Sequence, residues 1–180
     1  KNAIMSLAVA FIALAAYITL RFEYKIAISA LVSILHDLIM VLGFFSFFHL
    51  EIDATFLAAI LTVVGYSMNE AVVIFDRVRE NTRTHRRTDT YEKLAYDSIA
   101  QSIHRSIYTL TTVLFACGAL HFFGGESTKN FSLVMLIGFI SGAYSSICVD
   151  TSLWVVWKNH TSNRRGPKAV SHDEAEEEPV

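Results

Sequence analysis

A single carboxylate lies deep inside an apolar stretch of this 180-residue sequence. The stretch runs from Ala54 to Phe75, and Glu70, next to Asn69 in the segment GYSMNEAVVIFDRVREN (65–81), is the one charged residue in it. If this stretch crosses a membrane, Glu70 lies about 9 Å from the end of the span, at about 1.5 Å per residue, and a charge towards mid-membrane costs about 2.5–3.5 kcal/mol. A glutamate side chain is also short, which limits its reach to the interface. We therefore interpret Glu70 as a functional or ion-paired group.

Two further apolar stretches contain ionisable residues. Asp37, preceded by His36, lies near the middle of residues 26–48, and Arg105 lies near the start of residues 102–123. A structural hydrogen bond is the alternative explanation for Asp37, and Arg105 is long enough to extend to the lipid headgroups. Ionisable groups on the inward faces of membrane helices mark proton or ion pathways. We hypothesise that Glu70 carries protons, that Arg105 modulates its proton affinity, and that Asp37, His36 and Asn69 belong to the same pathway.

Five long apolar blocks must position these groups. The chain is 53% hydrophobic, and the blocks cover residues 2–20, 26–48, 54–75, 102–123 and 131–157. Each block has about 20 residues or more, enough for a helix to cross roughly 30 Å of hydrocarbon. Helices are favoured because each backbone polar group in lipid must be satisfied within the span. Residues 1–157 are therefore predicted to form an all-α, polytopic bundle of five transmembrane helices.

Polar residues recur within the blocks at steps of three or four, which places them on one face of a helix. The predicted stripes are Ser29, Ser33, His36 and Asp37 in the second block, Thr62, Tyr66, Asn69, Glu70 and Val73 in the third, and Ser102, Arg105, Ser106, Thr109 and Thr112 in the fourth. Tyr66, Ser106, Thr109 and Thr112 are the expected support of the pathway.

Small residues follow the same spacing in the fifth block. Gly138, Gly142 and Ser146 recur at steps of four, and Asp150 comes next. Such a pattern is typical of closely packed membrane helices, so the two glycines are predicted to serve helix packing. Asp150 receives no predicted role.

Lysine and arginine predict the orientation. Of the 15 such residues, twelve lie in residues 21–25, 76–97 and after 157, whereas the alternate loops and the N-terminus hold only Lys1 and Lys129. The positive-inside rule then places the 76–97 loop and the C-terminus in the cytoplasm. The N-terminus and the loops 49–53 and 124–130 are predicted to face outward.

The segments outside the blocks also carry patterns. From about residue 90 to 101, Tyr91, Leu94, Ala95 and Ile99 recur at helical spacing, which predicts an amphipathic helix on the cytoplasmic membrane surface. Residues 158–180, which end in SHDEAEEEPV, are predicted to be a disordered acidic tail. Because the chain starts at Lys1 without a signal-type charged region, we expect a fragment of a longer polypeptide.

Several function classes receive no support. Cys117 and Cys148 lie in apolar blocks and are predicted to be buried thiols rather than a disulfide or a metal site. No histidine pair has the spacing of a zinc helix, and there is no serine–histidine signature, so we predict no metal, no cofactor and no enzyme activity. The net charge of −2 gives no indication of nucleic-acid binding.

Four segments resemble the SecF family of the bacterial Sec protein-export machinery, within the resistance–nodulation–division superfamily. They are RFEYKIAISALVSILHD (21–37), FHLEIDATFLAAILTVVGYSMNEAVVIFDRVREN (48–81), SIHRSIYTLTT (102–112) and FGGESTKNFSLVMLIGFISGAYSSI (123–147). The resemblance implies that the chain holds spans two to six of a six-span protein of the bacterial cytoplasmic membrane. It further implies pairing with SecD, separate or fused, and work with the SecYEG translocon on preproteins, driven by proton flow.

The resemblance also implies roles for particular residues. The intramembrane carboxylate of the family motif GYSxND falls on Glu70, the family arginine on Arg105, and the family His–Asp pair on His36 and Asp37. Here glutamate replaces the usual aspartate. The longer side chain keeps the titratable group but leaves the pairing geometry open.

Two other functions stay open at this point. One is a proton-driven exporter of the same superfamily, which a larger extracytoplasmic part would distinguish. The other is a scaffold that holds translocon parts together and conducts nothing. The scaffold hypothesis predicts that neutralising Glu70 leaves activity intact, and the choice between protons and sodium ions is also open.

Overall fold

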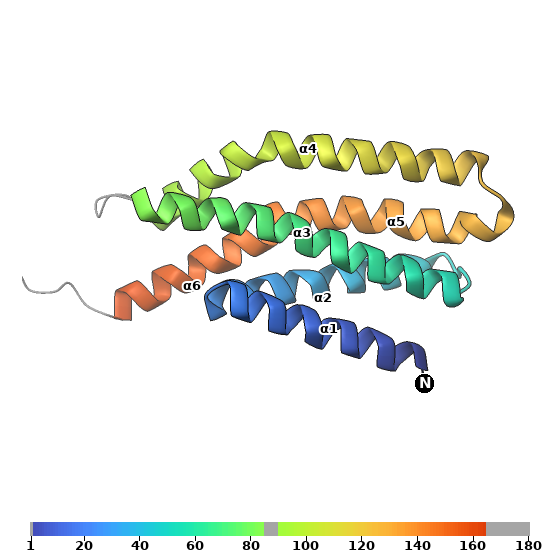
Figure 1. The fold of residues 1–180 in the computed structure, drawn as a ribbon, viewed down its shortest axis with the longest axis horizontal. Helices are drawn as coiled ribbons and strands as arrows, with labels where there is room; N and C mark the ends of the chain where they lie inside the picture. Colours follow the sequence, from blue (N-terminus) through green and yellow to red (C-terminus); the bar gives the residue numbers. More distant parts are fainter. Residues whose placement is uncertain (1, 85–89, 165–180) are drawn as a thin grey trace, which may run out of the picture.

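All regular elements in the computed structural model, which describes residues 2–84 and 90–164, are helices. They are α1 (Asn2–Arg21), α2 (Tyr24–Phe47), α3 (Ala54–Thr84), α4 (Tyr91–Phe123), α5 (Glu126–Ser145), the π-helical segment η1 (Ser146–Asp150) and α6 (Thr151–Arg164). Figure 1 shows these helices side by side as an elongated bundle. The predicted all-α class is confirmed.

Length and apolar surface identify a membrane-embedded bundle. In the part of the chain that the structure describes, four helical stretches are long and apolar enough to cross a membrane, and α1 contains the shorter apolar stretch Ala8–Arg21. Large apolar side chains cover the outside of the bundle, among them Leu20, Phe47, Phe115, Phe122 and Phe123. In lipid this surface needs no cover, because acyl chains are as apolar as leucine.

The core lies where α5 packs against α2, α3 and α4. Val63 on α3 and Val134 on α5 are fully buried in it. A Cβ atom at Gly138 would collide with the Val63 side chain, so the glycine allows α5 to lie directly against α3. This close approach holds the polar groups of both helices in a fixed relation.

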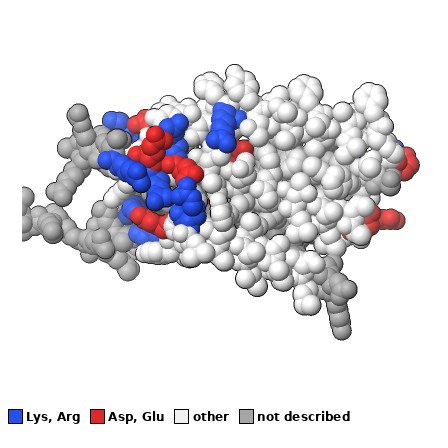
Figure 2. All heavy atoms as spheres, viewed as in Figure 1, with Lys and Arg blue, Asp and Glu red and all other residues white. Residues whose placement is uncertain are grey.

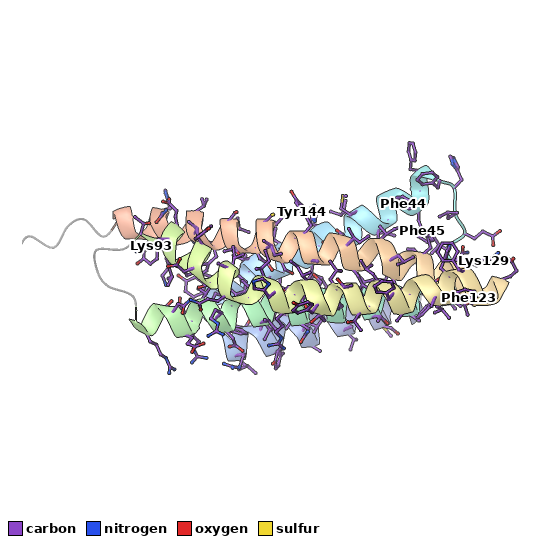
Figure 3. All side chains as sticks on the ribbon, turned by 90° about the horizontal axis from the view of Figure 1, so that it is seen from above. Phe44, Phe45, Lys93, Phe123, Lys129 and Tyr144 are labelled. Carbon is purple, nitrogen blue, oxygen red and sulfur yellow. The ribbon has the colours of Figure 1, made fainter. Side chains whose placement is uncertain are left out.

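The ends of the helices alternate as the sequence predicts. The N-terminus and the α2–α3 and α4–α5 turns lie at one end of the bundle, whereas α6 ends at the other (Figure 1). Lys93 and Lys129 mark these opposite ends in Figure 3. Lysine and arginine gather near the end of α6, and a broad uncharged band follows (Figure 2). That this basic end faces the cytoplasm stays a prediction.

Residues 91–101 differ from the expected separate surface helix. They form the first part of α4, which continues to Phe123, and the Thr90 side chain caps it by accepting a hydrogen bond from the Lys93 backbone N–H. Leu94 and Ala95 are buried, and the Tyr91 ring meets the Trp154 ring edge-on at 6.2 Å between centroids. Because the apolar face packs on the bundle, no break in the helix is needed before the span.

The last span is one helical rod with a wider turn in it. Segment η1 joins α5 to α6, and the Thr151 hydroxyl donates to the carbonyl of Ser146, 3.3 Å away and five residues earlier. Cys117 is buried as predicted, but Cys148 is exposed on the side of this rod, so the prediction of two buried thiols was wrong for Cys148. Residues 158–164, assigned to the tail from sequence, are helical; residues 165–180 lie outside the described part.

Candidate functional site

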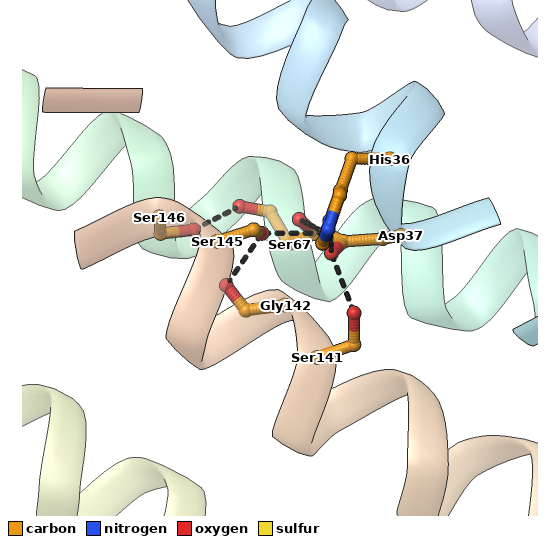
Figure 4. A network of polar contacts seen from close by, with 7 residues as sticks. All are labelled: His36, Asp37, Ser67, Ser141, Gly142, Ser145 and Ser146. Atoms are coloured by element: carbon orange, nitrogen blue, oxygen red, sulfur yellow. Dashed lines mark hydrogen bonds and ion pairs between the residues drawn. The ribbon is translucent and has the colours of Figure 1, made fainter. Parts of the chain in front are cut away.

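The carboxylate of Asp37 lies at the centre of a polar network between α2, α3 and α5 (Figure 4). Its side chain is 1% exposed. Ser67 on α3 donates to Oδ2 at 2.6 Å, and on α5 Ser145 donates to Oδ2 at 2.9 Å and Ser141 to Oδ1 at 2.8 Å. An ionised carboxylate accepts hydrogen bonds and donates none. Three hydroxyl donors therefore match an ionised Asp37 and tie three helices together.

Local helix geometry explains this convergence. Ser141 and Ser145 are four residues apart, so they lie on one face of α5. Gly142 lies between them, and a Cβ atom there would be 3.3 Å from the Cβ of Ser67 and 3.6 Å from Oδ2 of Asp37. The glycine thus keeps the space in which the serines and the carboxylate meet, which is a packing role.

His36 lies at the edge of this network. Its Nδ1 is 3.4 Å from Oδ1 of Asp37, and its side chain is 36% exposed. The neighbouring residue on a helix points about 100° away. His36 therefore reaches back towards the carboxylate from the outer side of α2 and adds little to its enclosure.

The second predicted carboxylate, Glu70, has a different environment. It is 3% exposed on α3, one turn from Ser67. Within residues 2–84 and 90–164, no hydrogen bond or ion pair to its carboxylate is found. Tyr66 lies within electrostatic range of Glu70, and the buried Tyr66 hydroxyl has no partner in the same described part of the chain. Glu70 is therefore buried, but no donor among the described residues binds its carboxylate.

Arg105 lies in a groove between α3 and α4. The groove has a volume of about 480 Å³ and is lined by Asn69, Val72, Val73, Asp76, Arg77, Glu80, Gln101, Ser102 and Arg105. Arg105 is exposed, and no ion pair joins it to Glu70 among the described residues. Asn69 faces the groove, whereas the adjacent Glu70 faces the interior. Asn69 and Arg105 therefore line the same groove, whereas Glu70 is buried on the interior side of α3 and is not part of the groove lining.

The polar residues predicted to form one stripe on α4 lie in two different environments, an exposed face and the buried face of the helix. Thr109 donates to the carbonyl of Arg105 and Thr112 to that of Tyr108, both at 2.9 Å, so these hydroxyls are satisfied within their own helix on an exposed face. Ser106 is 4% exposed, and its buried hydroxyl lacks a partner in the described part. Of the predicted stripe, only Ser102 and Ser106 face the bundle fully.

Three residues of the network were not predicted from the sequence. Ser67, Ser141 and Ser145 hold Asp37, and none of them was among the predicted site residues. The available signals were the four-residue spacing on α5 and the position of Ser67 inside GYSMNE. Neither signal indicates which helix these hydroxyls face. No group of three or more potential metal ligands is present in residues 2–84 and 90–164.

Comparisons with known proteins agree on one family. Residues 1–160 match the family model described as protein export membrane protein SecD/SecF, C-terminal. Protein translocase subunit SecF of Alicyclobacillus acidocaldarius is 42% identical over 174 residues, which cover 94% of this chain and 56% of that protein. Protein translocase subunit SecDF of Bacillus subtilis is 42% identical over 161 residues, or 88% of this chain and 22% of that protein.

A solved structure has the same arrangement of helices. A crystal structure of SecDF in a super-membrane-facing form matches with a TM-score of 0.87 at 36% sequence identity, covering 93% of this chain and 23% of that one. The chain thus spans about half the length of the SecF relative and about a quarter of the SecDF chain.

Proposed function

Because the chain belongs to the SecD/SecF family of protein-export membrane proteins, we propose that it couples proton flow to late steps of preprotein translocation across the bacterial cytoplasmic membrane. Its relatives are protein translocase subunits, and the resemblance of the four sequence segments is confirmed. The proposed partners are SecD, the SecYEG translocon, the preprotein and the lipid bilayer. The relative named SecDF supports SecD as a separate or fused partner.

The observation that carries the proposal is the state of Glu70. A carboxylate that is 3% exposed and lacks a hydrogen-bond donor among the described residues is costly when ionised. Protonation removes the charge and the cost. A buried carboxyl group without a fixed partner is therefore the group that we propose as the proton carrier.

Arg105 is the proposed agent of that change. It lies across the α3–α4 groove with Asn69, the residue next to Glu70. A small movement of α4 against α3 that brings the guanidinium to the carboxylate would stabilise the ionised form and release the proton. Arginine suits this role because it stays charged and pairs with both carboxylate oxygens.

Asp37 has the complementary role in this proposal. Its three serine donors fix α2, α3 and α5 around one point. A fixed network is a poor carrier, because proton uptake by Asp37 would disturb three hydrogen bonds together. We assign Asp37 to the framework against which α4 moves, with His36 as a minor contact.

The test uses the full-length subunit with its partners in membrane vesicles. Preprotein release is measured with and without a proton gradient for the wild type, Glu70→Gln and Glu70→Asp. Glu70→Gln keeps the shape but holds no exchangeable acidic proton, so its release should fall to the level seen without a gradient. Glu70→Asp is the matched control and should keep most of the gradient-dependent release.

Arg105→Lys extends the test to the groove. It keeps the charge but loses the planar fork, so gradient-dependent release should be reduced rather than abolished. Full gradient-dependent release in Glu70→Gln would contradict the carrier role. That result would favour the scaffold function, for which the Asp37 network is sufficient.

A further inference from the structure

The proposed function leaves one buried carboxylate unused. Asp150, at the end of η1, is 1% exposed, and neither of its oxygens has a hydrogen-bond partner in the described part of the chain. Buried polar groups in proteins nearly always have partners. An ionised carboxylate without any partner in an apolar bundle is far more costly than a neutral acid.

The neighbours of Asp150 belong to α2. Asp37 lies within electrostatic range of Asp150, and Ser33 lies beside it. The Ser33 hydroxyl is buried, lies close enough to Asp150 to interact with it, and has no partner among the other described residues. Ser33 and Asp37 are four residues apart and share one face of α2. Segment η1 packs against this helix, so two carboxylates and one unused hydroxyl meet at the same place.

The distribution of donors separates the two carboxylates. Asp37 accepts hydrogen bonds from three serines, whereas Asp150 accepts none from the described residues. Two carboxylates in one buried site do not both ionise, because their charges repel. The charge therefore belongs on Asp37 and the proton on Asp150.

We propose that Asp150 is a second proton-binding carboxyl group, which holds a proton as a neutral acid next to the Asp37 network. The Ser33 hydroxyl is free to accept the hydrogen bond that the neutral acid donates. A role of this proton in translocation rests on the proposed proton coupling, but the presence of the proton does not.

A pocket at the basic end of the bundle lies close to this site. Trp154 follows Asp150 by four residues, is 2% exposed, and has an indole N–H without a partner in the described part. It forms part of the wall of a pocket of about 460 Å³, together with Arg21, Glu23, Arg79, Arg83 and Lys158. One helical turn, about 6 Å along the axis, separates Asp150 from Trp154. This pocket shares no lining residue with the groove that holds Arg105.

Infrared spectroscopy tests the proposal on the full-length subunit with its partner in lipid. A protonated carboxyl group has a carbonyl stretch that a carboxylate lacks. The wild-type spectrum minus that of Asp150→Asn should contain this band. The control is Asp53→Asn, which removes an exposed carboxylate and should leave the band unchanged. Ser33→Ala should keep the band and shift it to higher frequency, because the hydrogen bond to the acid is lost.

Two results would overturn the proposal. One is a wild-type spectrum without an acid band that depends on Asp150. The other is a carboxylate band of Asp150 that shifts when sodium replaces potassium, which would indicate a bound cation instead of a proton. Since the spectra are taken without a gradient, they decide this proposal even if Glu70→Gln shows that the subunit carries no protons.

Discussion

Asp37 and Glu70 are the same chemical group in two different surroundings. Both are almost fully buried, on neighbouring helices of one bundle. Asp37 receives three serine hydroxyls, whereas Glu70 receives no hydrogen bond from the described residues. The difference shows that burial alone does not identify a working group. In the function that we propose, the donors around each carboxylate distinguish the structural role of Asp37 from the proton-binding role of Glu70.

The largest expected difference between the two sites is in stability. Asp37→Ala leaves three buried hydroxyls without their acceptor, and each such loss costs about 1–3 kcal/mol. Truncation of Glu70 to alanine creates a comparable cavity, but it leaves no described hydrogen-bond donor without its acceptor. The free energy of unfolding, measured by denaturant titration in detergent, should be lower by about 3 kcal/mol for Asp37→Ala than for Glu70→Ala. Equal values for the two variants would refute the distinction.

Close packing on the Asp37 side predicts the next largest effect. Gly138→Ala forces a methyl group into Val63, and overpacking of this kind costs about 1–3 kcal/mol. Gly65→Ala on α3 is the control, because nothing lies within 4 Å of its added methyl group. Thermal unfolding should show a lower midpoint for Gly138→Ala and an unchanged midpoint for Gly65→Ala. Adding Val63→Ala to Gly138→Ala should restore the midpoint. A loss of stability in both glycine variants would mean that helix contact is not the cause.

Single serine substitutions test the three donors to Asp37 one at a time. Ser67→Ala, Ser141→Ala and Ser145→Ala each remove one donor to Asp37, and each should lower stability by about 1 kcal/mol. Ser106→Ala, on α4, removes a hydroxyl that has no partner among the described residues. It should leave the unfolding midpoint unchanged or slightly raised. If Ser106→Ala lowers the stability as much as each of the other three substitutions, the hydrogen bonds to Asp37 are not the cause of the loss.

The smallest effect is expected for a carboxylate outside the membrane. Asp53 accepts hydrogen bonds from the Thr55 hydroxyl at 2.7 Å and from the backbone N–H of Phe56 at 2.8 Å. These bonds lower the pKa of Asp53 below its ordinary value. Its contribution to stability is present above the unfolded-state pKa of about 3.9, and it is lost as the pH falls through the lower folded-state value.

Asp53→Asn checks this pH dependence. Asparagine also caps helices well, so stability near neutral pH should be almost unchanged. The slight loss of stability that the wild type shows on acidification should be absent from the variant. Identical acid profiles for the two proteins would show that the Asp53 cap does not contribute.

The long apolar blocks made the fold predictable. Hydrophobic length is a strong signal in membrane proteins, because lipid imposes helices on any spanning segment. The continuity of α4 was not predictable in this way. The apolar residues Leu94 and Ala95 fit a surface helix as well as a buried one, and only their contact with the bundle distinguishes the two.

The site was predictable in part. Asp37 and Glu70 were recognisable because charge in an apolar run is rare. The serines were not, since a serine in a helix commonly bonds to its own backbone, as Ser29 does with the carbonyl of Lys25. Which serine turns instead towards Asp37 depends on how the helices are rotated against each other. That rotation is set by packing and is not contained in the spacing of any one segment.

The wider turn of η1 sets the phase of the last helix. An α-helix repeats about every 3.6 residues, so in an uninterrupted continuation Val149 would follow Ser145 along the line that faces α2. The π-helical turn delays the repeat by one residue, and Asp150 takes that line instead, with Trp154 following four residues later. The chemistry presented to Asp37 therefore depends on one backbone turn as much as on a side chain. If an α-helical turn replaced this π-helical turn with the sequence unchanged, Val149 would face α2 in place of Asp150.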